Sequence, residues 1–373
     1  MKIGTLVAQK KLLVCVGSGG VGKTTTAASI ALAGAYAGRR ALVLTIDPAR
    51  RLANSLGLTE IGNLEHRIVL PPEVKGELWA MMLDAPSTFD DVIRKVARDD
   101  ATREAIFANR IYRSIAASFS GSQEYMATER LYDVVQSGRY DLVILDTPPV
   151  KNALDFLDAP GRLARFLDKQ VMKRLLAPHE EDHGGGFFGS RLLAGTTAVV
   201  YRLLGHIFGE AFLGDIAAFF ALFKDLYDGF RERHEAVERM FIDAGTSFVV
   251  VAAPTEPSME VAGFFFTELR ARGLPLGALI ANQVHRAEFR TPDVEATLGA
   301  AARAQDPTAA GPLLARLEAA HGRLGALATL ESARVEQLRR QAGPTVDLHV
   351  VPRLDGEVHD LASLALLHRF LIG

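Results

Sequence analysis

A glycine-rich segment near the amino terminus limits the fold of this chain more than any other feature. Residues 14–25 read VCVGSGGVGKTT, in which Gly17 to Thr24 fit the pattern G-x-x-x-x-G-K-[ST] between an expected apolar strand and an alanine-rich helix. This order is typical of a phosphate-binding loop, where backbone N–H groups surround phosphate oxygens, Lys23 reaches the terminal phosphates and the Thr24 hydroxyl ligates magnesium. The helix opening at about Lys23 adds the positive end of its dipole to this anion site.

Short aliphatic runs recur along the chain and predict an α/β fold with a doubly wound, mostly parallel sheet, as in P-loop NTPases, with helical insertions. The runs are continuous rather than alternating, which is typical of strands covered on both faces. In such sheets ligands bind at the carboxyl ends of the strands. The expected strands are residues 12–16, 41–46, 78–83, 142–145, 248–252, 276–281 and 346–351.

Two long helical segments interrupt this alternation. Residues 87–138 read as several helices, which we assign to an ATPase core formed by 1–158 and 246–373. Residues 159–245 are richer in phenylalanine and are expected to form a separate helical insertion.

A third helical piece is expected at 294–342, with a Pro/Gly loop at 306–312. Its charged residues predict a solvated face. They are Glu318, Arg323, Glu331 and Arg339.

Composition excludes several classes of protein. A formal net charge of −2 argues against a nucleic-acid surface or a polybasic membrane anchor. The one cysteine, Cys15, cannot form a disulfide framework or a cysteine-based metal cluster, and in a strand it is expected to be a small buried hydrophobe rather than a reactive thiol. The basic and then apolar start superficially resembles a signal peptide, but the apolar run is short and ends in the phosphate loop. We therefore expect a cytoplasmic protein without an integral membrane segment.

Two expected strands end in aspartates that suit phosphoryl transfer to water, a reaction that needs a metal, a phosphate cradle and a carboxylate that orients the attacking water. Asp146, in Asp146-Thr147-Pro148-Pro149, has the Walker B position and is expected to hold the magnesium shell through water. Asp47 is placed to orient water on the γ-phosphate. One such aspartate alone would be an ordinary cap or turn residue.

These motifs resemble the arsenite-pump ATPase (ArsA) family of deviant Walker A P-loop NTPases, which also includes the eukaryotic ATPase that targets tail-anchored membrane proteins. The bacterial "anion-transporting ATPase" branch is the nearest match, and the likeness covers nearly the whole chain. It rests on residues 19–25, Asp47-Pro48-Ala49, Asp146-Thr147-Pro148-Pro149, residues 154–160, Ala281-Asn282-Gln283 and Gln123-Glu124-Tyr125-Met126-Ala127.

The resemblance implies ATP or ADP and Mg²⁺ as ligands. Asn282 would read adenine, and Pro352 and Arg353 fall where the family closes the base pocket. Asp47 and Asp146, with Thr24, would serve the metal. The implied phosphate-binding residues are Gly19, Gly20, Val21, Gly22, Lys23, Thr24 and Thr25.

The chain also departs from the family pattern. Ser18 stands where members usually carry a second lysine that reaches the partner's phosphates across a dimer interface. We predict that Lys151 supplies this charge, in cis or across a dimer, with Arg50 and Arg51 behind it; a solvated loop lysine is the alternative. The thiol cluster of the arsenite pump and the cysteine pair of the targeting ATPase's zinc clasp are both missing, so activation by arsenite through thiolate ligands is chemically implausible.

Three further segments have two readings each. His179-Glu180-Glu181-Asp182-His183 matches a zinc-protease motif, but Pro178 and three following glycines disfavour the helix that it needs, so a mobile loop is expected. The leucines of 361–371 predict packing rather than membrane docking. An apolar helical stripe predicts either core packing or a client-binding groove. It comprises Phe208, Phe212, Ile216, Phe219, Phe220, Phe223, Tyr227 and Phe230.

The leading hypothesis is a magnesium-dependent ATPase that works as a dimeric switch, in which ATP closes the Asp47 region and residues 146–152 and repositions the helical insertion. The dimer would be a homodimer or a heterodimer with a paralogue, and a hydrophobic protein is the expected client. The main alternative is a low-turnover nucleotide-binding regulatory subunit. A ParA/MinD-type organising ATPase is disfavoured by the lack of a basic surface, and a small-molecule kinase stays open.

Overall fold

The computed structural model divides into two compact units. The first comprises Met1–Met82, Val134–Ala153 and Phe241–Gly373, and the second Leu83–Asp133 and Leu154–Met240. The structure describes residues 2–46, 51–58, 61–62, 64–110, 112–113, 123–148, 215, 218–219, 226–286, 299, 303–304, 307–354 and 356–372.

The first unit is built on an eight-stranded sheet in the order β3-β4-β2-β5-β1-β6-β7-β8. All neighbouring strands are parallel except β3 and β4, which are antiparallel. Each expected strand is present, and the α/β fold is confirmed. The strands are β1 Leu12–Val16, β2 Arg40–Thr45, β3 His66–Ile68, β4 Glu77–Met82, β5 Leu142–Asp146, β6 Thr246–Ala252, β7 Leu276–Val284 and β8 Asp347–Pro352.

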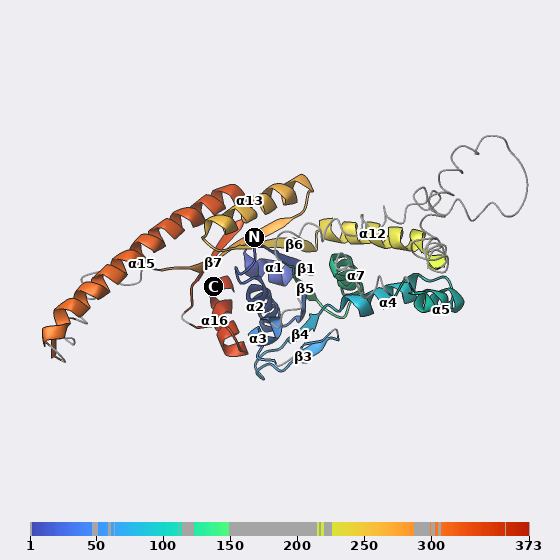
Figure 1. Cartoon of the computed structure of the whole chain (residues 1–373), viewed down its shortest axis with the longest axis horizontal. Coiled ribbons are helices and arrows are strands. Elements are labelled where there is room, and N and C mark those ends of the chain that lie inside the picture. The colour runs from blue at the N-terminus through green and yellow to red at the C-terminus, as the bar shows by residue number, and fades with distance from the viewer. Residues whose placement is uncertain are drawn as a thin grey trace, which may run out of the picture. The chain divides into compact units, whose positions relative to one another are not determined.

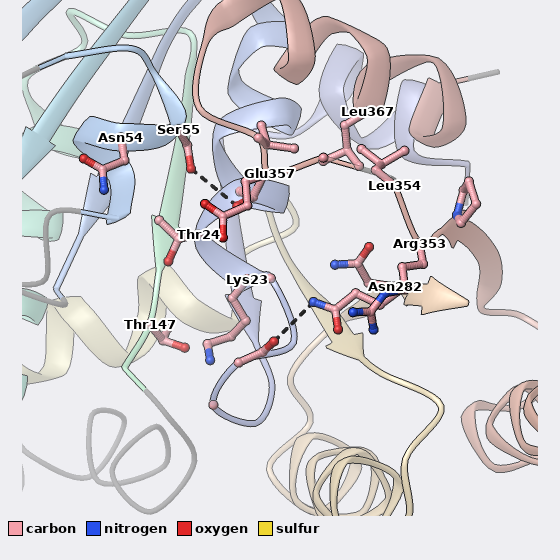
Figure 2. A pocket seen from close by; sticks show the side chains of 18 residues that line it. Lys23, Thr24, Asn54, Ser55, Thr147, Asn282, Arg353, Leu354, Glu357 and Leu367 are labelled. Atoms are coloured by element: carbon pink, nitrogen blue, oxygen red, sulfur yellow. Dashed lines mark hydrogen bonds between the residues drawn. The ribbon is translucent and has the colours of Figure 1, made fainter. Parts of the chain in front are cut away.

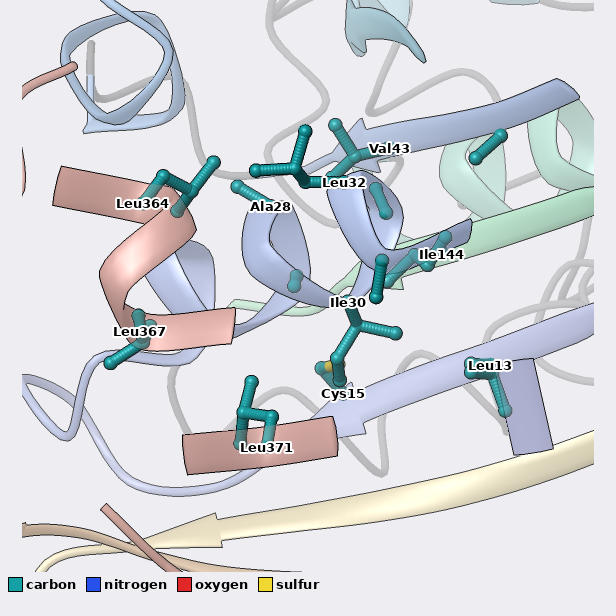
Figure 3. Packing of buried hydrophobic residues seen from close by; sticks show 14 of the residues in the cluster. Leu13, Cys15, Ala28, Ile30, Leu32, Val43, Ile144, Leu364, Leu367 and Leu371 are labelled. Carbon is teal, nitrogen blue, oxygen red and sulfur yellow. The ribbon is translucent and has the colours of Figure 1, made fainter. Parts of the chain in front are cut away.

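One face of this sheet is covered by α1 (Ile3–Gln9), α2 (Lys23–Tyr36), α3 (Arg51–Ser55) and α16 (Leu361–Ile372), which share one apolar cluster with the strands (Figure 1). Small side chains let α2 approach closely: a Cβ on Gly34 would lie 2.9 Å from a methyl of Leu142. In Figure 3, Ile30 of α2 points toward Cys15 of β1, and Leu371 of α16 lies beside them. The predicted packing of the carboxy-terminal leucines is thereby confirmed.

The opposite face carries α13 (Glu256–Ala271) and α15 (Pro307–Ala342), which contact β6 and β7 (Figure 1). Val335 of α15 packs against Ala281 and Val284 of β7. The two groups of helices on opposite faces confirm the doubly wound arrangement.

Helix α15 corrects two expectations from the sequence. The loop expected at 306–312 is wrong, because the helix begins at Pro307 and continues through Pro312. Pro307 fits the first helical position, and Pro312 removes one hydrogen bond close to the end. The solvated face is wrong at one residue, because Glu331 is buried whereas Glu318, Arg323 and Arg339 are exposed.

The second unit contains α4 (Ala85–Val96), α5 (Asp100–Ala108), and most of α7 (Gln123–Gln136) and α12 (Tyr227–Ile242). Arg233 of α12 binds both Glu129 and Asp133 of α7, the latter at 2.8 Å. This contact joins α7 to α12 within the second unit, and the division into an ATPase core and an insertion at 159–245 stays a prediction.

The apolar stripe of 208–230 lies largely outside the described residues. Phe219 is described and buried, which does not distinguish a groove from a core. Among the helices that the structure describes, none is long and apolar enough to cross a membrane.

Candidate functional site

The phosphate loop joins β1 to α2 and depends on glycines for its path. Gly20 and Gly22 have φ values of +78° and +84°, a region that side chains disfavour. Gly17 passes so close to β6 that a Cβ would lie 2.1 Å from the carbonyl oxygen of Val251. Helix α2 begins at Lys23, with Gly22 as its N-cap. The loop therefore presents a helix amino terminus to the pocket in front of it, as the sequence predicts (Figure 2).

Lys23 is held over this loop. Its side chain is largely buried, and its Nζ donates to the carbonyl oxygen of Ser18 at 2.8 Å. A buried ammonium group requires such partners, because it has lost hydration. An anion on the loop would offer Lys23 a stronger, charged acceptor.

Asp146 lies at the end of β5, between β1 and β2, and is 1% exposed. Its Oδ2 accepts hydrogen bonds from the hydroxyls of Thr24, at 2.7 Å, and Thr45, at 2.9 Å. Since the Thr24 hydroxyl donates its proton to the carboxylate, its lone pairs remain able to ligate a cation. Hydroxyl and carboxylate oxygens are the ligands that Mg²⁺ prefers. The residues present therefore fit magnesium.

Asn282 and Gln283, at the end of β7, both contact the phosphate loop. The Asn282 side-chain amide donates to the carbonyl oxygen of Val21 at 2.7 Å, and that of Gln283 to the carbonyl oxygen of Gly20 at 3.3 Å. A Cβ on Gly22 would lie only 2.4 Å from Nδ2 of Asn282. The loop and the strand end thus fit each other closely. The two amides link the end of β7 to the phosphate loop.

The pocket in front of the loop has a volume of about 580 Å³. It brings together most of the predicted site residues, namely Gly19, Gly20, Gly22, Lys23, Thr24, Thr25, Asn282, Pro352 and Arg353. Its further lining residues were not predicted as site residues, although Thr147 and Gln283 belong to the motifs quoted from the sequence and Leu367 to the carboxy-terminal leucines. The full set is Asn54, Ser55, Thr147, Gln283, Leu354, Gly356, Glu357, Val358 and Leu367.

Two of these lining residues come shortly after strands, which is a sequence signal that could have identified them as site residues. Thr147 directly follows β5 and Leu354 comes two residues after β8, whereas Gln283 lies within β7 beside Asn282. Figure 2 shows Asn54 and Ser55 on one side of the pocket and Arg353 and Leu354 on the other. In a parallel sheet such positions share one edge.

Ser18, at the position of the family's second lysine, is turned toward its own chain. Its hydroxyl donates to that of Ser258 on α13 at 3.1 Å, and Ser258 in turn accepts from the backbone N–H of Ala253. The first turn of α13 therefore supports the phosphate loop from the side.

Other predicted residues are not located. Asp47, Arg50, Lys151 and the segment 179–183 lie outside the described residues, and of Arg51 only the backbone is described.

Cys15 behaves as the sequence predicts. It is fully buried, and burial, with a smaller contribution from the nearby Asp146 carboxylate, raises the pKa of its thiol. A thiol kept protonated in this way is a weak nucleophile.

Residues 10–183 match the family described as anion-transporting ATPase. ATPase ASNA1 homolog 1 of Paramecium tetraurelia is 30% identical over 181 residues, which cover 47% of this chain and 51% of the relative. ATPase GET3 of Chaetomium globosum is 26% identical over 271 residues, 72% of this chain and 71% of the relative. Uncharacterized protein SCO2128 of Streptomyces coelicolor is 28% identical over 275 residues, covering 74% and 62%. The chain spans about half the length of the Paramecium relative.

Proposed function

On the premise that residues 10–183 match the anion-transporting ATPase family, we propose that the protein is a magnesium-dependent ATPase that acts as a dimeric switch. Nucleotide state is coupled to a helical, apolar region that binds a client or partner. The single observation that carries the proposal is the hydrogen bond between Thr24 and Asp146, because Thr24 and Lys23 both line a pocket large enough for a ligand.

Each part of the site has a defined task. The loop backbone holds the phosphates, and Lys23 exchanges the Ser18 carbonyl for a terminal phosphate oxygen. Asp146 accepts the proton of the Thr24 hydroxyl, so the hydroxyl lone pairs would be available to hold magnesium. Bound magnesium supplies charge neutralisation on the phosphate oxygens. Asp47 orients the attacking water; β2, which precedes it, ends at Thr45, whose hydroxyl binds Asp146.

The base is held on the other side of the pocket. One N–H of the Asn282 amide is engaged by Val21, which leaves a second N–H and the carbonyl oxygen to pair with the edge of adenine. Pro352 and Arg353 line the same pocket and would pack against the base.

The switch and its client rest on less direct support. The relatives' printed names call them ATPases, and the spacing of phenylalanines in the sequence of 208–230 predicts an apolar helical surface. The near-neutral charge disfavours nucleic acid as a partner. With a single buried cysteine the protein suits a reducing compartment, and we place it in the cytoplasm.

The decisive experiment measures Mg·ATP binding by calorimetry and phosphate release in the same preparation. We expect micromolar-range binding in the native protein and a large loss in Thr24→Ala, with Thr24→Ser as the matched control that keeps the hydroxyl. Absence of Mg·ATP binding in the native protein would refute the proposal. Appearance of a phosphorylated small molecule in place of free phosphate would identify a kinase instead.

The dimer requires a separate measurement. Light scattering with a non-hydrolysable ATP analogue and with ADP is expected to give a larger mass with the analogue. An equal monomeric mass in both states would exclude the dimeric switch while leaving the ATPase intact.

A low-turnover regulatory subunit is the second candidate, and the contact between Ser18 and Ser258 favours it. A serine cannot supply the charge of the family's second lysine, which in related trans-acting cations accelerates hydrolysis by about 10³ to 10⁵. Tight binding of ATP with turnover that rises on Ser18→Lys, or on addition of a paralogue, would support this candidate. Fast hydrolysis by the native chain alone would exclude it.

A further inference from the structure

The end of β7 is irregular at the point where it meets the nucleotide pocket. The pairing of β7 with β8 shifts between Ala281 and Val284, so Asn282 and Gln283 form a bulge. Gln283 has a φ of +62°, and among the described residues it is the one non-glycine with a positive φ. Such a conformation is disfavoured for an L-residue and persists where the surroundings enforce it.

The bulge is what turns two amides toward the phosphate loop. In a regular strand, successive side chains alternate between the two faces of the sheet. Here both Asn282 and Gln283 instead donate to the same loop, through the carbonyl oxygens of Val21 and Gly20. The orientation of Asn282 therefore depends on the backbone of the bulge being held.

Glu331 of α15 holds His285, the residue that follows β7. Its Oε2 accepts from the backbone N–H of His285 at 2.7 Å, and its Oε1 lies 2.9 Å from Nδ1 of the same residue. The carboxylate is 5% exposed, and a buried carboxylate is costly unless it is hydrogen-bonded. Both of its oxygens are engaged by this one residue.

Two further contacts lock the same segment. Val335, one helical turn after Glu331, packs against Ala281 and Val284 on the two sides of the bulge. The Val284 carbonyl oxygen accepts from the backbone N–H of Arg353, which lines the base side of the pocket.

We propose that Glu331 is a positioning residue of the nucleotide site: by anchoring His285 it maintains the β7 bulge and so aims the Asn282 amide at the base. This inference rests on the proposed function. Glu331 is not among the residues that line the pocket, and it acts through the backbone between His285 and Asn282.

The test compares a ligand that has a base with one that lacks it. Dissociation constants for Mg·ATP and for Mg·tripolyphosphate are measured in the native protein, in Glu331→Gln and in Glu318→Gln. Glu318 lies on the same helix and is exposed, so its variant is the matched control. Glutamine keeps the shape of Glu331 but turns one of its two acceptor oxygens into an N–H donor that faces His285.

We expect Glu331→Gln to weaken Mg·ATP about 10-fold, as loss of one charged hydrogen bond predicts, and to change tripolyphosphate binding less than about twofold, since the phosphate loop is retained. Glu318→Gln should match the native protein for both ligands. If Glu331→Gln binds Mg·ATP as the native protein does, or loses affinity for both ligands equally, the inference is wrong.

A second variant covers the case in which Glu331→Gln fails to fold. His285→Ala removes the ring contact and keeps the backbone N–H that Glu331 binds, and we expect about a threefold selective loss for Mg·ATP. No selective loss in this variant overturns the inference. A native protein that does not bind Mg·ATP at all refutes the proposed function instead, so the two failures are distinguishable.

Discussion

Substitution of Gly22 by alanine separates the two demands that the phosphate loop makes on a glycine. The first is backbone conformation, because φ is +84°. The second is space, because the new Cβ would lie 2.4 Å from Nδ2 of Asn282. Gly38, in the turn between α2 and β2, is the matched control: its φ is +81°, and a Cβ there meets nothing within 4 Å.

The expected magnitudes follow from these contacts. Alanine in a left-handed conformation costs about 1–2 kcal/mol at either site. At Gly22 the Asn282 amide must also retreat, since 3.4 Å is the lower end of ordinary contact, and its hydrogen bond to Val21 is lost. That bond contributes about 1 kcal/mol. We therefore expect Gly22→Ala to lose about 2–3 kcal/mol of folding free energy, and Gly38→Ala about 1–2.

Urea denaturation measures the loss of folding free energy, and calorimetry measures the affinity for Mg·ATP. Gly22→Ala is expected to bind Mg·ATP about 10-fold more weakly, as displacement of one positioned amide predicts, whereas Gly38→Ala should bind as the native protein does. Equal destabilisation of the two variants together with native Mg·ATP affinity in Gly22→Ala would refute the close fit between loop and strand end on which this reasoning depends.

Three other perturbations test separate parts of the structure. Asp146→Asn should slow phosphate release about 10- to 100-fold, as for other residues that orient a metal ligand; an unchanged rate would remove Asp146 from the site. Arg233→Met removes the charged partner of the buried Glu129 carboxylate. It should lower the free energy of unfolding, measured by urea denaturation at neutral pH, by about 3–5 kcal/mol. Burial already raises the pKa of Glu129 above its ordinary value, so the stability that protonated Glu129 contributes is lost as the pH rises through the folded-state pKa. The loss of stability in the variant should therefore shrink as the pH falls below that pKa. A loss that does not change with pH would contradict the pairing of Arg233 with Glu129. Leu364→Ala should cost about 2–5 kcal/mol, whereas Leu366→Ala on the exposed side of α16 should cost far less, and similar losses in both would contradict the packing.

The sheet and the phosphate loop could be predicted because their signals are local. Continuous apolar runs report burial on both faces, and the spacing from Gly17 to Thr24 reports one backbone path. Asp146 was identifiable because it directly follows such a run. In contrast, β3 has only three residues, which is too short to show a hydrophobic period.

The role of Glu331 could not be predicted, because its local sequence resembles that of Glu318. Both are glutamates in a helix rich in alanine and arginine. They differ in their contacts, because the backbone N–H of His285, 46 residues earlier in the chain, donates to Glu331. A contact between elements that are distant in the sequence produces no pattern in a single sequence. The hydrogen bond between Ser18 and Ser258 could not be predicted for the same reason.

The burial of Cys15 has a practical consequence. Because the one thiol of the chain lies within the central strand and stays protonated, maleimide dyes should leave the native protein unmodified. Any cysteine introduced on the surface then becomes a unique attachment point, without prior removal of the natural one. A donor and an acceptor fluorophore placed in the two units could follow their separation through the nucleotide cycle.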